Sequence, residues 1–158
     1  MSDQSPGEKS RPSGGYAVLL AAYTAIVGLL FWRLQAGREL PDRFGPGDLA
    51  LFGVATHKLS RITTKDKVTA PLRTPFTEED EGEAGPAEVS ESSRGEGMRR
   101  AIGELLICPY CVGQWIATGL LGLFSVAPRT ARCIAAVFTV VAISDFLQIA
   151  YKAGEEKL

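Results

Sequence analysis

Residues 104–115 read ELLICPYCVGQW and mark the point where a polar part of the chain turns into a hydrophobic one. Pro109 ends a helix that arrives from the N-terminal side, because its ring removes a backbone donor and clashes with the preceding turn. Its neighbours Cys108 and Cys111 form a Cys-x-x-Cys set, which can act as a redox pair or supply half of a metal site. The stretch therefore predicts a short helix over 99–107, a break carrying two thiols, and a hydrophobic helix over 111–127.

The apolar residues are concentrated rather than spread along the chain. Hydrophobic residues make up 46% of its 158 residues and fall in three clusters, at 16–32, 111–127 and 133–151. The first cluster carries no charge, is about 26 Å long as a helix, and ends at Trp32 and Arg33, an interfacial anchor pair. We therefore predict an all-α integral membrane protein with three transmembrane helices. The first is predicted to be a retained span, because no clear cleavage site for a signal peptidase follows it.

A further helix is predicted between residues 48 and 63. Asp48 is placed to cap its N-terminus, and cations gather near its C-terminal end, where they suit the negative end of the helix dipole. His57 and Arg61 are four positions apart and so share a face. The segment is either an amphipathic or re-entrant helix at the membrane surface, or a short fourth spanning helix. The composition leaves both alternatives open.

Charge divides the chain into segments. The window 77–98 holds eight acids and one base and has almost nothing to bury, so it predicts a disordered acidic linker. The rest of the chain is basic. Basic residues beside membrane spans usually report topology and anionic headgroups, so nucleic acid is not expected. The predicted segments are a disordered tail at 1–15, a first span, amphipathic helix and basic proline-containing segment at 16–76, the linker at 77–98, the Cys-x-x-Cys segment and last two spans at 99–151, and a C-terminal tail at 152–158.

The distribution of Lys and Arg predicts the orientation in the membrane. Placing the long basic loop inside puts most cations in the cytoplasm and leaves Arg129 and Arg132 in the outer turn. Both alternatives for the 48–63 helix then place Cys108, Cys111 and the C-terminus on the cytoplasmic side. The N-terminus lies outside if that helix does not cross the membrane, and inside if it does.

Two blocks of sequence carry a family resemblance. The runs ATHKLSR at 55–61 and KDKVTAPLRTPF at 65–76, followed by the Cys-x-x-Cys block, resemble the DUF1360 family of bacterial membrane proteins. The resemblance covers roughly residues 48–76 and 101–150. It implies a location in the bacterial cell membrane. Because the family includes a Bacillus sporulation protein, it also implies a link to sporulation or envelope processes, but it implies no reaction.

The two thiols support three interpretations. In a thiol-disulfide oxidoreductase, Cys108 would be the nucleophile at a helix N-terminus and Cys111 the resolving thiol. Glutaredoxins carry the same Cys-Pro-Tyr-Cys set within a βαβ frame, which this sequence lacks. In a zinc site, the thiols would join His57, with Asp66 or Glu104 completing the ligands. In a structural turn, the thiols would only pack or form hydrogen bonds.

Charged residues suggest two more sites. A basic set at the end of the 48–63 helix could hold an anionic headgroup or phosphate, or could simply reach the headgroups as a basic edge. This set consists of Lys58, Arg61, Lys65 and Lys67. Asp145 interrupts the last apolar cluster, and intramembrane carboxylates are costly and usually face a partner. Its natural counter-charges are Arg61, His57 and Lys58, which would fix the second helix against the last span.

The sequence thus predicts a small multi-pass membrane protein with no assigned reaction. The preferred hypothesis is a non-enzymatic component whose cytoplasmic face, built from residues 57–76 and 104–115, binds a protein partner, anionic lipid or metal. The alternatives are a membrane thiol oxidoreductase acting through Cys108 and Cys111, and a metal-dependent membrane enzyme or sensor, with His57 as the candidate acid–base group. Expected partners are the lipid bilayer and either a membrane protein or a second copy of the chain.

Overall fold

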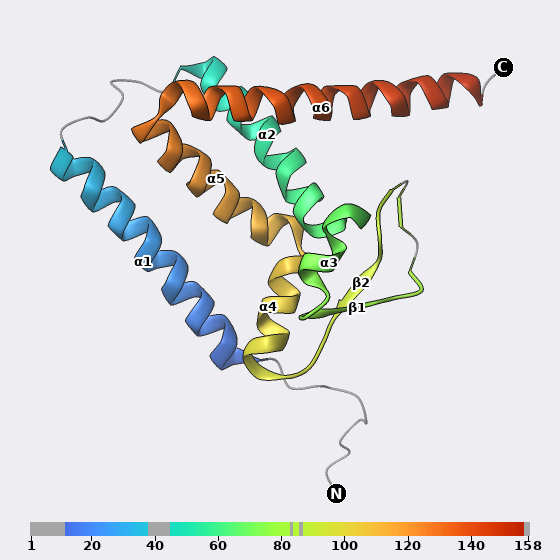
Figure 1. Ribbon diagram of the computed structural model, residues 1–158, viewed down its shortest axis with the longest axis horizontal. Helices are drawn as coiled ribbons and strands as arrows, with labels where there is room; N and C mark the ends of the chain where they lie inside the picture. Colours follow the sequence, from blue (N-terminus) through green and yellow to red (C-terminus); the bar gives the residue numbers. More distant parts are fainter. Residues whose placement is uncertain (1–11, 38–44, 83, 86, 157–158) are drawn as a thin grey trace, which may run out of the picture.

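The computed structural model describes residues 12–37, 45–82, 84–85 and 87–156. The elements in chain order are α1 (Ser13–Gly37), α2 (Pro46–Lys65), the 3-10 helix η1 (Lys67–Thr69), α3 (Ala70–Arg73), β1 (Thr77–Glu79), β2 (Glu91–Ser93), α4 (Gly97–Ile107), α5 (Pro109–Val126) and α6 (Pro128–Glu155). The described part is therefore all-α apart from one short hairpin, as predicted (Figure 1).

Helix α2 is the centre of the packing. It makes its most extensive contacts with α5 and α6, so a helix of modest hydropathy lies between two apolar ones. The core joins all three helices, and alanines on α6 let the backbones approach closely. Its buried members are Phe52, Ala55, Leu120, Phe124, Ala131 and Ala135. Phe52 and Phe124 meet edge to face with ring centroids 5.2 Å apart, a favoured aromatic geometry.

The predicted break at Pro109 is present. Helix α4 ends at Ile107, α5 begins at Pro109, and the two helices are bent by 81°. By length and composition, α1 and α6 could each cross a membrane, and the bent pair α4–α5 would be a third crossing if it counts as one span. Within the described residues, α2 does not meet that test. Two of the three predicted spans are thus matched by single long helices.

Helix α1 lies along the outside of the other helices and is held mainly at its N-terminal end. There Gly15 packs directly on α4, where an added Cβ would lie 2.6 Å from Cβ of Ala101. Figure 1 shows α1 running beside α5, with its first turn next to α4. Most of its apolar side chains are exposed, which is compatible with a lipid bilayer environment.

Residues 77–98 differ from the disordered linker predicted for them. Strands β1 and β2 form an antiparallel hairpin in which Thr77 pairs with Ser93 and Glu79 with Glu91. A second bridge joins Asp66 to Glu88, so the hairpin is attached to the end of α2. Acidic segments remain disordered when they have nothing to bury, but here two of the glutamates pair with arginines outside the segment, on α2 and α3.

The predicted tails also change. Residues 1–11 lie outside the described residues, whereas 13–15 already belong to α1. At the other end, α6 continues through the predicted tail at 152–158 as far as Glu155, and residues 157–158 lie outside the described part. The outer turn predicted to hold Arg129 and Arg132 is the start of α6, because Pro128 is well suited to a helix N-terminus.

The contact between α4 and the hairpin depends on a residue without a side chain. A Cβ at Gly103 would lie 2.4 Å from the carbonyl oxygen of Phe76 and 3.1 Å from Cβ of Ser93. We expect Gly103→Ala to lower the free energy of unfolding in detergent by about 1–3 kcal/mol, the usual cost of overpacking. Thermal unfolding followed by circular dichroism measures the change.

The matched control is Gly53→Ala on α2, where an added Cβ meets nothing within 4 Å. This substitution should be neutral or stabilising by up to about 1 kcal/mol, because alanine is the better helix former. Equal unfolding temperatures for the two variants would show that the hairpin is not packed on α4 as described.

Candidate functional site

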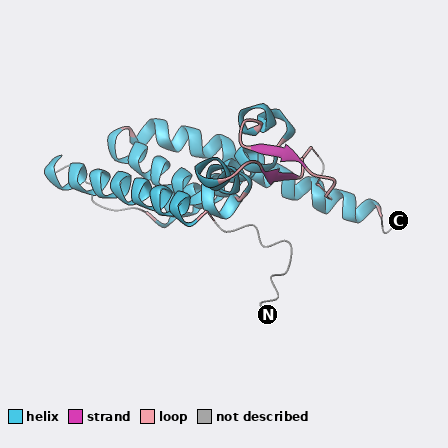
Figure 2. Ribbon diagram, turned by 90° about the horizontal axis from the view of Figure 1, so that it is seen from below, coloured by secondary structure: helices cyan, strands magenta, loops and turns pink. Residues whose placement is uncertain are grey.

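The candidate site is a polar region at the C-terminal end of α2. We call it the polar cap and define it as η1, α3, the hairpin β1–β2 and α4. Figure 2 shows the two strands lying beside the helical part of the molecule. The cap unites the two sequence blocks that the family resemblance singled out, because α4 leads directly into Cys108 and α5.

Arg73 forms the centre of the cap. The residue is 1% exposed, and its guanidinium forms a salt bridge with the carboxylate of Glu91 on β2. The same guanidinium donates to the carbonyl oxygen of Thr63 at 2.8 Å and to that of Asp66 at 3.2 Å. It also donates to the hydroxyl of Thr69 at 2.7 Å. One buried cation thus joins α2, η1, α3 and β2.

Glu91 is held as firmly as its partner. Its second carboxylate oxygen accepts a hydrogen bond of 2.9 Å from the hydroxyl of Thr77, which is 2% exposed. Both side chains of the Arg73–Glu91 pair are almost fully buried. A buried charge must be paired and hydrogen-bonded, and this network meets both conditions for the carboxylate.

A second arginine attaches the hairpin to α2. Arg61 forms a salt bridge with Glu88 and donates to the same carboxylate oxygen from Nε at 3.1 Å. Backbone bonds reinforce this contact, because the N–H of Val89 donates to the carbonyl of Lys65 at 2.8 Å and that of Lys67 to the carbonyl of Ala87 at 3.1 Å. The acidic segment is therefore bound to the basic end of α2.

The predicted anion-binding set is consequently divided among different partners. Lys58 faces Asp145, and Arg61 faces Glu88. Lys65 and Lys67 form no salt bridge with the described part of the chain, and Lys67 is exposed. An anionic headgroup that bound all four cations would have to displace two carboxylates of the protein itself.

Asp145 has a partner of the predicted kind. Its carboxylate lies 2.7 Å from the ammonium of Lys58, whose side chain is 16% exposed. Of the three counter-charges considered, the structure selects Lys58, while Arg61 turns to the hairpin. His57 instead stacks on Phe146, with ring centroids 6.5 Å apart and planes 18° apart. Both contacts join α2 to α6.

The thiols lie at the joint between α4 and α5. Cys108 is the N-cap of α5, and its sulfur accepts a hydrogen bond of 3.2 Å from the backbone N–H of Cys111. The next turn of α5 packs on α2, where Gly113 faces Thr56 and Ser60. The sulfur of Cys108 thus has a definite structural role, which is to satisfy a free donor at a helix start.

The structure does not assemble the proposed zinc ligands. Among the described residues, no three His, Cys, Asp or Glu side chains lie close enough to share a metal ion. His57 is stacked on α6, while Glu104 accepts hydrogen bonds from Tyr16 and Arg100. Asp66 serves the cap through its backbone carbonyl. The set Cys108, Cys111 and His57 is therefore not gathered into one site.

Sequence reasoning missed the central pair, Arg73 and Glu91. Arg73 was visible as a cation between Pro71 and Pro75, and Glu91 as one acid among eight in the window 77–98. The available signal was weak, since only Thr77 and Val89 in this window are β-branched residues that favour a strand. Nothing in the sequence distinguishes Glu91 from its neighbours as the buried acid.

Comparison with known proteins gives a family but no activity. The model of a family described as "Protein of unknown function (DUF1360)" matches residues 51–151, which run from α2 to α6. "Sporulation protein YjcA" of Bacillus subtilis (strain 168) is 31% identical over 102 residues, covering 63% of this chain and 86% of that protein. No solved structure matches the chain.

The buried pair in the cap can be tested by removing its members singly and together. We expect Arg73→Met alone and Glu91→Leu alone each to lower the free energy of unfolding by about 3–5 kcal/mol, because each leaves an uncompensated buried charge. The double variant should recover much of that loss, since no charge is then left unpaired. Chemical unfolding in detergent measures stability, and limited proteolysis reports whether residues 77–93 detach.

Arg94→Ala is the control, because Arg94 and Glu78 form an exposed pair 3.7 Å apart. Such pairs contribute about 0–1 kcal/mol. If Arg73→Met cost no more than Arg94→Ala, the cap would not depend on its buried arginine.

Proposed function

This chain belongs to the DUF1360 family, and from that premise we propose that it is a non-enzymatic, multi-pass protein of the bacterial cytoplasmic membrane whose polar cap binds a protein partner. The observation that carries the proposal is the pairing of its reactive groups. Lys58, Arg61 and Arg73 each hold a carboxylate of the same chain, and Cys108 caps a helix. These groups are committed to building a surface rather than to turning over a substrate.

The proposal that the chain sits in a membrane rests on its long exposed helices. Helices α1 and α6 are long and apolar enough to cross a bilayer, and large apolar side chains along both are exposed. In water such faces would associate, whereas in a bilayer they meet lipid. The apolar helices thus support a bilayer environment.

The contacts between α2 and α6 support the alternative in which α2 is a fourth helix that crosses the membrane. Along α2 and α6, three contacts follow in order: Asp48 with Arg132, the carbonyl of Leu51 with Thr139, and Lys58 with Asp145. The contacts therefore follow the same order along both helices, which cross at an angle and diverge toward their C-terminal ends (Figure 1). Helix α2 has 20 residues, about 30 Å of length, which is enough to cross the hydrocarbon core.

The same geometry relates the ends of the chain to the cap. The first turn of α1 lies against α4, since Tyr16 donates to Glu104. Its N-terminal end and the cap therefore share one side, and α6 leads back toward that side. The last residue of α2 and the cap, with the short segment between β2 and α4, carry six Lys and Arg, namely Lys65, Lys67, Arg73, Arg94, Arg99 and Arg100. Among the described residues, the opposite end carries Arg33 near the end of α1 and Arg129 and Arg132 in the first turns of α6. The excess of positive charge favours a cytoplasmic cap, with both termini in the cytoplasm.

The charge of the cap favours protein over lipid as its partner. Glu79, Asp80 and Glu81 are exposed on the hairpin and form no salt bridge with the described residues. Anionic headgroups would be repelled by these acids, whereas a basic protein surface would be attracted. The buried network behind them holds the surface in place before binding, which lowers the entropy cost of association.

The biological process is inferred from the relative alone. The matched Bacillus protein is called a sporulation protein, and this chain covers 86% of it. We therefore propose a role in sporulation or another envelope process, in which the cap recruits a basic protein to the membrane.

Cysteine labelling tests the topology. In a variant with Cys108, Cys111 and Cys133 replaced by Ser, single cysteines are introduced as Ser13→Cys, Glu79→Cys and Thr130→Cys. All three positions are exposed. A membrane-impermeant maleimide should label Thr130→Cys in intact cells, and the other two only after permeabilisation. Labelling of Ser13→Cys from outside would show that α2 does not cross.

Photo-cross-linking tests the partner. A photoreactive amino acid in place of Glu79 should give a discrete protein adduct in cells, whereas one in place of Thr130, at the other end, should not. Asp80→Lys with Glu81→Lys should greatly reduce the adduct, because attraction becomes repulsion. Salt near 1 M should weaken it in membranes, since the screening length falls to about 3 Å.

The Cys108→Ser and Cys111→Ser variant provides the control for this experiment. It should leave the adduct unchanged, because the proposed surface does not use the thiols. An adduct whose yield is unchanged by the charge reversal, or one that is lost when the cysteines are replaced, would contradict the proposal.

A further inference from the structure

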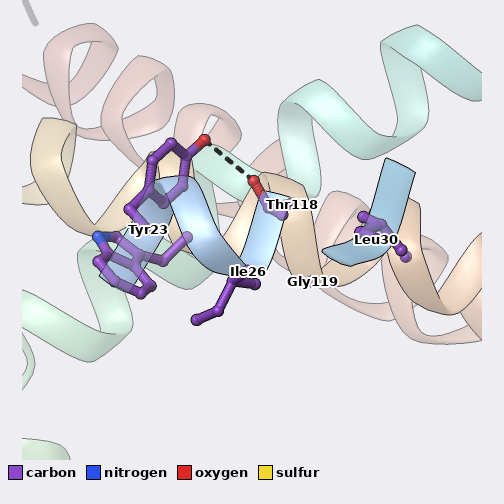
Figure 3. Close-up of a pocket in the computed structure, with 7 residues that line it drawn as sticks. Tyr23, Ile26, Leu30, Thr118 and Gly119 are labelled. Carbon is purple, nitrogen blue, oxygen red and sulfur yellow. Dashed lines mark hydrogen bonds between the residues drawn. The ribbon is translucent and has the colours of Figure 1, made fainter. Parts of the chain in front are cut away.

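A cavity of about 360 Å³ lies between α1 and α5, away from the polar cap. Figure 3 shows it from close by, with side chains of α1 on one wall and α5 on the other. It is lined by Tyr23, Ile26, Leu30, Trp115, Thr118, Gly119 and Gly122. Its size and mostly apolar lining with a few polar groups are typical of small-molecule and lipid sites.

The polar groups of the cavity lie at the end nearer the cap. Thr118 donates its hydroxyl hydrogen to the carbonyl of Gln114 at 2.9 Å, so the hydrogen bond of 3.1 Å between Tyr23 and Thr118 has Tyr23 as donor. Trp115 meets Tyr23 edge to face at 5.1 Å. Its indole N–H forms no hydrogen bond with the described part of the chain and is not a buried orphan, so this donor is accessible at the cap end of the cavity.

The other end of the cavity is purely apolar. Gly119 is open, because an added Cβ there would meet nothing within 4 Å. At Gly122 an added Cβ would touch the methyl groups of Leu30 at 3.4 Å and 3.5 Å, an ordinary contact. From Trp115 to Gly122 the wall of α5 extends seven residues, about 10 Å. The wall therefore changes along its length from a free donor to an apolar channel.

We infer that this cavity binds one diacyl glycerolipid of the membrane. An ester carbonyl would accept from the indole of Trp115, and one acyl chain would run past Gly119 toward Gly122 and Leu30. The polar end of the wall matches the polar end of the lipid. Trp115 lies near the cap end of α5, where the membrane interface is proposed, and tryptophan side chains are enriched at that depth. The inference rests on the proposed membrane insertion.

Fluorescence of Trp115 provides the test. The full chain carries two tryptophans, so Trp32→Phe leaves Trp115 as the reporter. This protein is reconstituted into phosphatidylglycerol vesicles whose acyl chains are brominated, which quenches nearby tryptophan, and is then repurified in excess detergent. We expect Trp115 to remain quenched relative to a preparation from unbrominated vesicles, because the bound lipid is retained while bulk lipid is removed.

Two leucine substitutions distinguish loss of lipid from this cavity from a general effect of adding a leucine to a helix. Gly119→Leu places a side chain in the open part of the cavity, at a position where its Cβ has room, and should abolish the retained quenching. Gly28→Leu adds the same side chain on α1 at a position with nothing within 4 Å and outside the cavity lining, and it should leave the quenching intact. Phospholipid phosphorus per chain should fall in parallel for Gly119→Leu. It should also fall for Trp115→Phe, which loses the donor but keeps an aromatic ring.

The outcomes separate this inference from the proposed function. Alkaline extraction of the vesicles shows whether the chain is inserted; a chain that is washed off would overturn both proposals. An inserted chain whose emission is the same with brominated and unbrominated lipid would overturn the lipid site alone. If wild type elutes as a dimer and Gly119→Leu as a monomer, with no retained quenching, the cavity holds a second copy of the chain and the lipid assignment is wrong.

Discussion

The cap depends on a single constraint, the burial of the guanidinium of Arg73. This group cannot lose its charge, so the chain around it has to supply acceptors. Thr63 and Asp66 supply backbone carbonyls and Thr69 a hydroxyl, but these three acceptor groups are uncharged and lie within ten residues of Arg73. The counter-charge, Glu91, comes from 18 residues further along, and the chain between must fold back to deliver it. The hairpin is thus the consequence of one buried arginine rather than of strand propensity.

A second ion pair explains how a helix as polar as α2 can occupy the centre of an apolar bundle. Lys58 and Asp145 neutralise each other across the contact between α2 and α6, and Arg61 is directed to the hairpin. The apolar residues Phe52 and Ala55 meet the core. Helix α2 therefore needs apolar residues mainly on the face that packs against α5 and α6, where Phe52 and Ala55 are buried. Helix α2 is accordingly not among the described helices that are apolar enough by composition to cross a membrane.

The sequence was informative wherever the signal was local. Pro109 predicted the break between α4 and α5, and the charge-free run 16–32 predicted α1, because both follow from properties of neighbouring residues. The hairpin was not predictable in this way. Eight acids in one window have no apolar period, and only the fold shows that Glu88 and Glu91 meet arginines. Lys58, rather than His57 or Arg61, pairs with Asp145 because of how α2 is rotated about its axis relative to α6. The sequence of α2 does not determine that rotation.

The stretch 104–115 gains its importance from what it connects rather than from its thiols. Glu104 binds Tyr16 of α1, Cys108 caps α5 at the bend, and Trp115 lines the cavity against α1. Helix α1 is thus joined both to α4, which carries the hairpin through Gly103, and to the wall of the cavity. A molecule in the cavity would contact α1 and α5, and a protein on the cap would contact the hairpin and α4, which are joined to the same two helices. Helices α4 and α5 meet at a single non-helical residue, Cys108, where the chain bends by 81°. At that position the sulfur of Cys108 caps the start of α5 by accepting a hydrogen bond from the backbone N–H of Cys111.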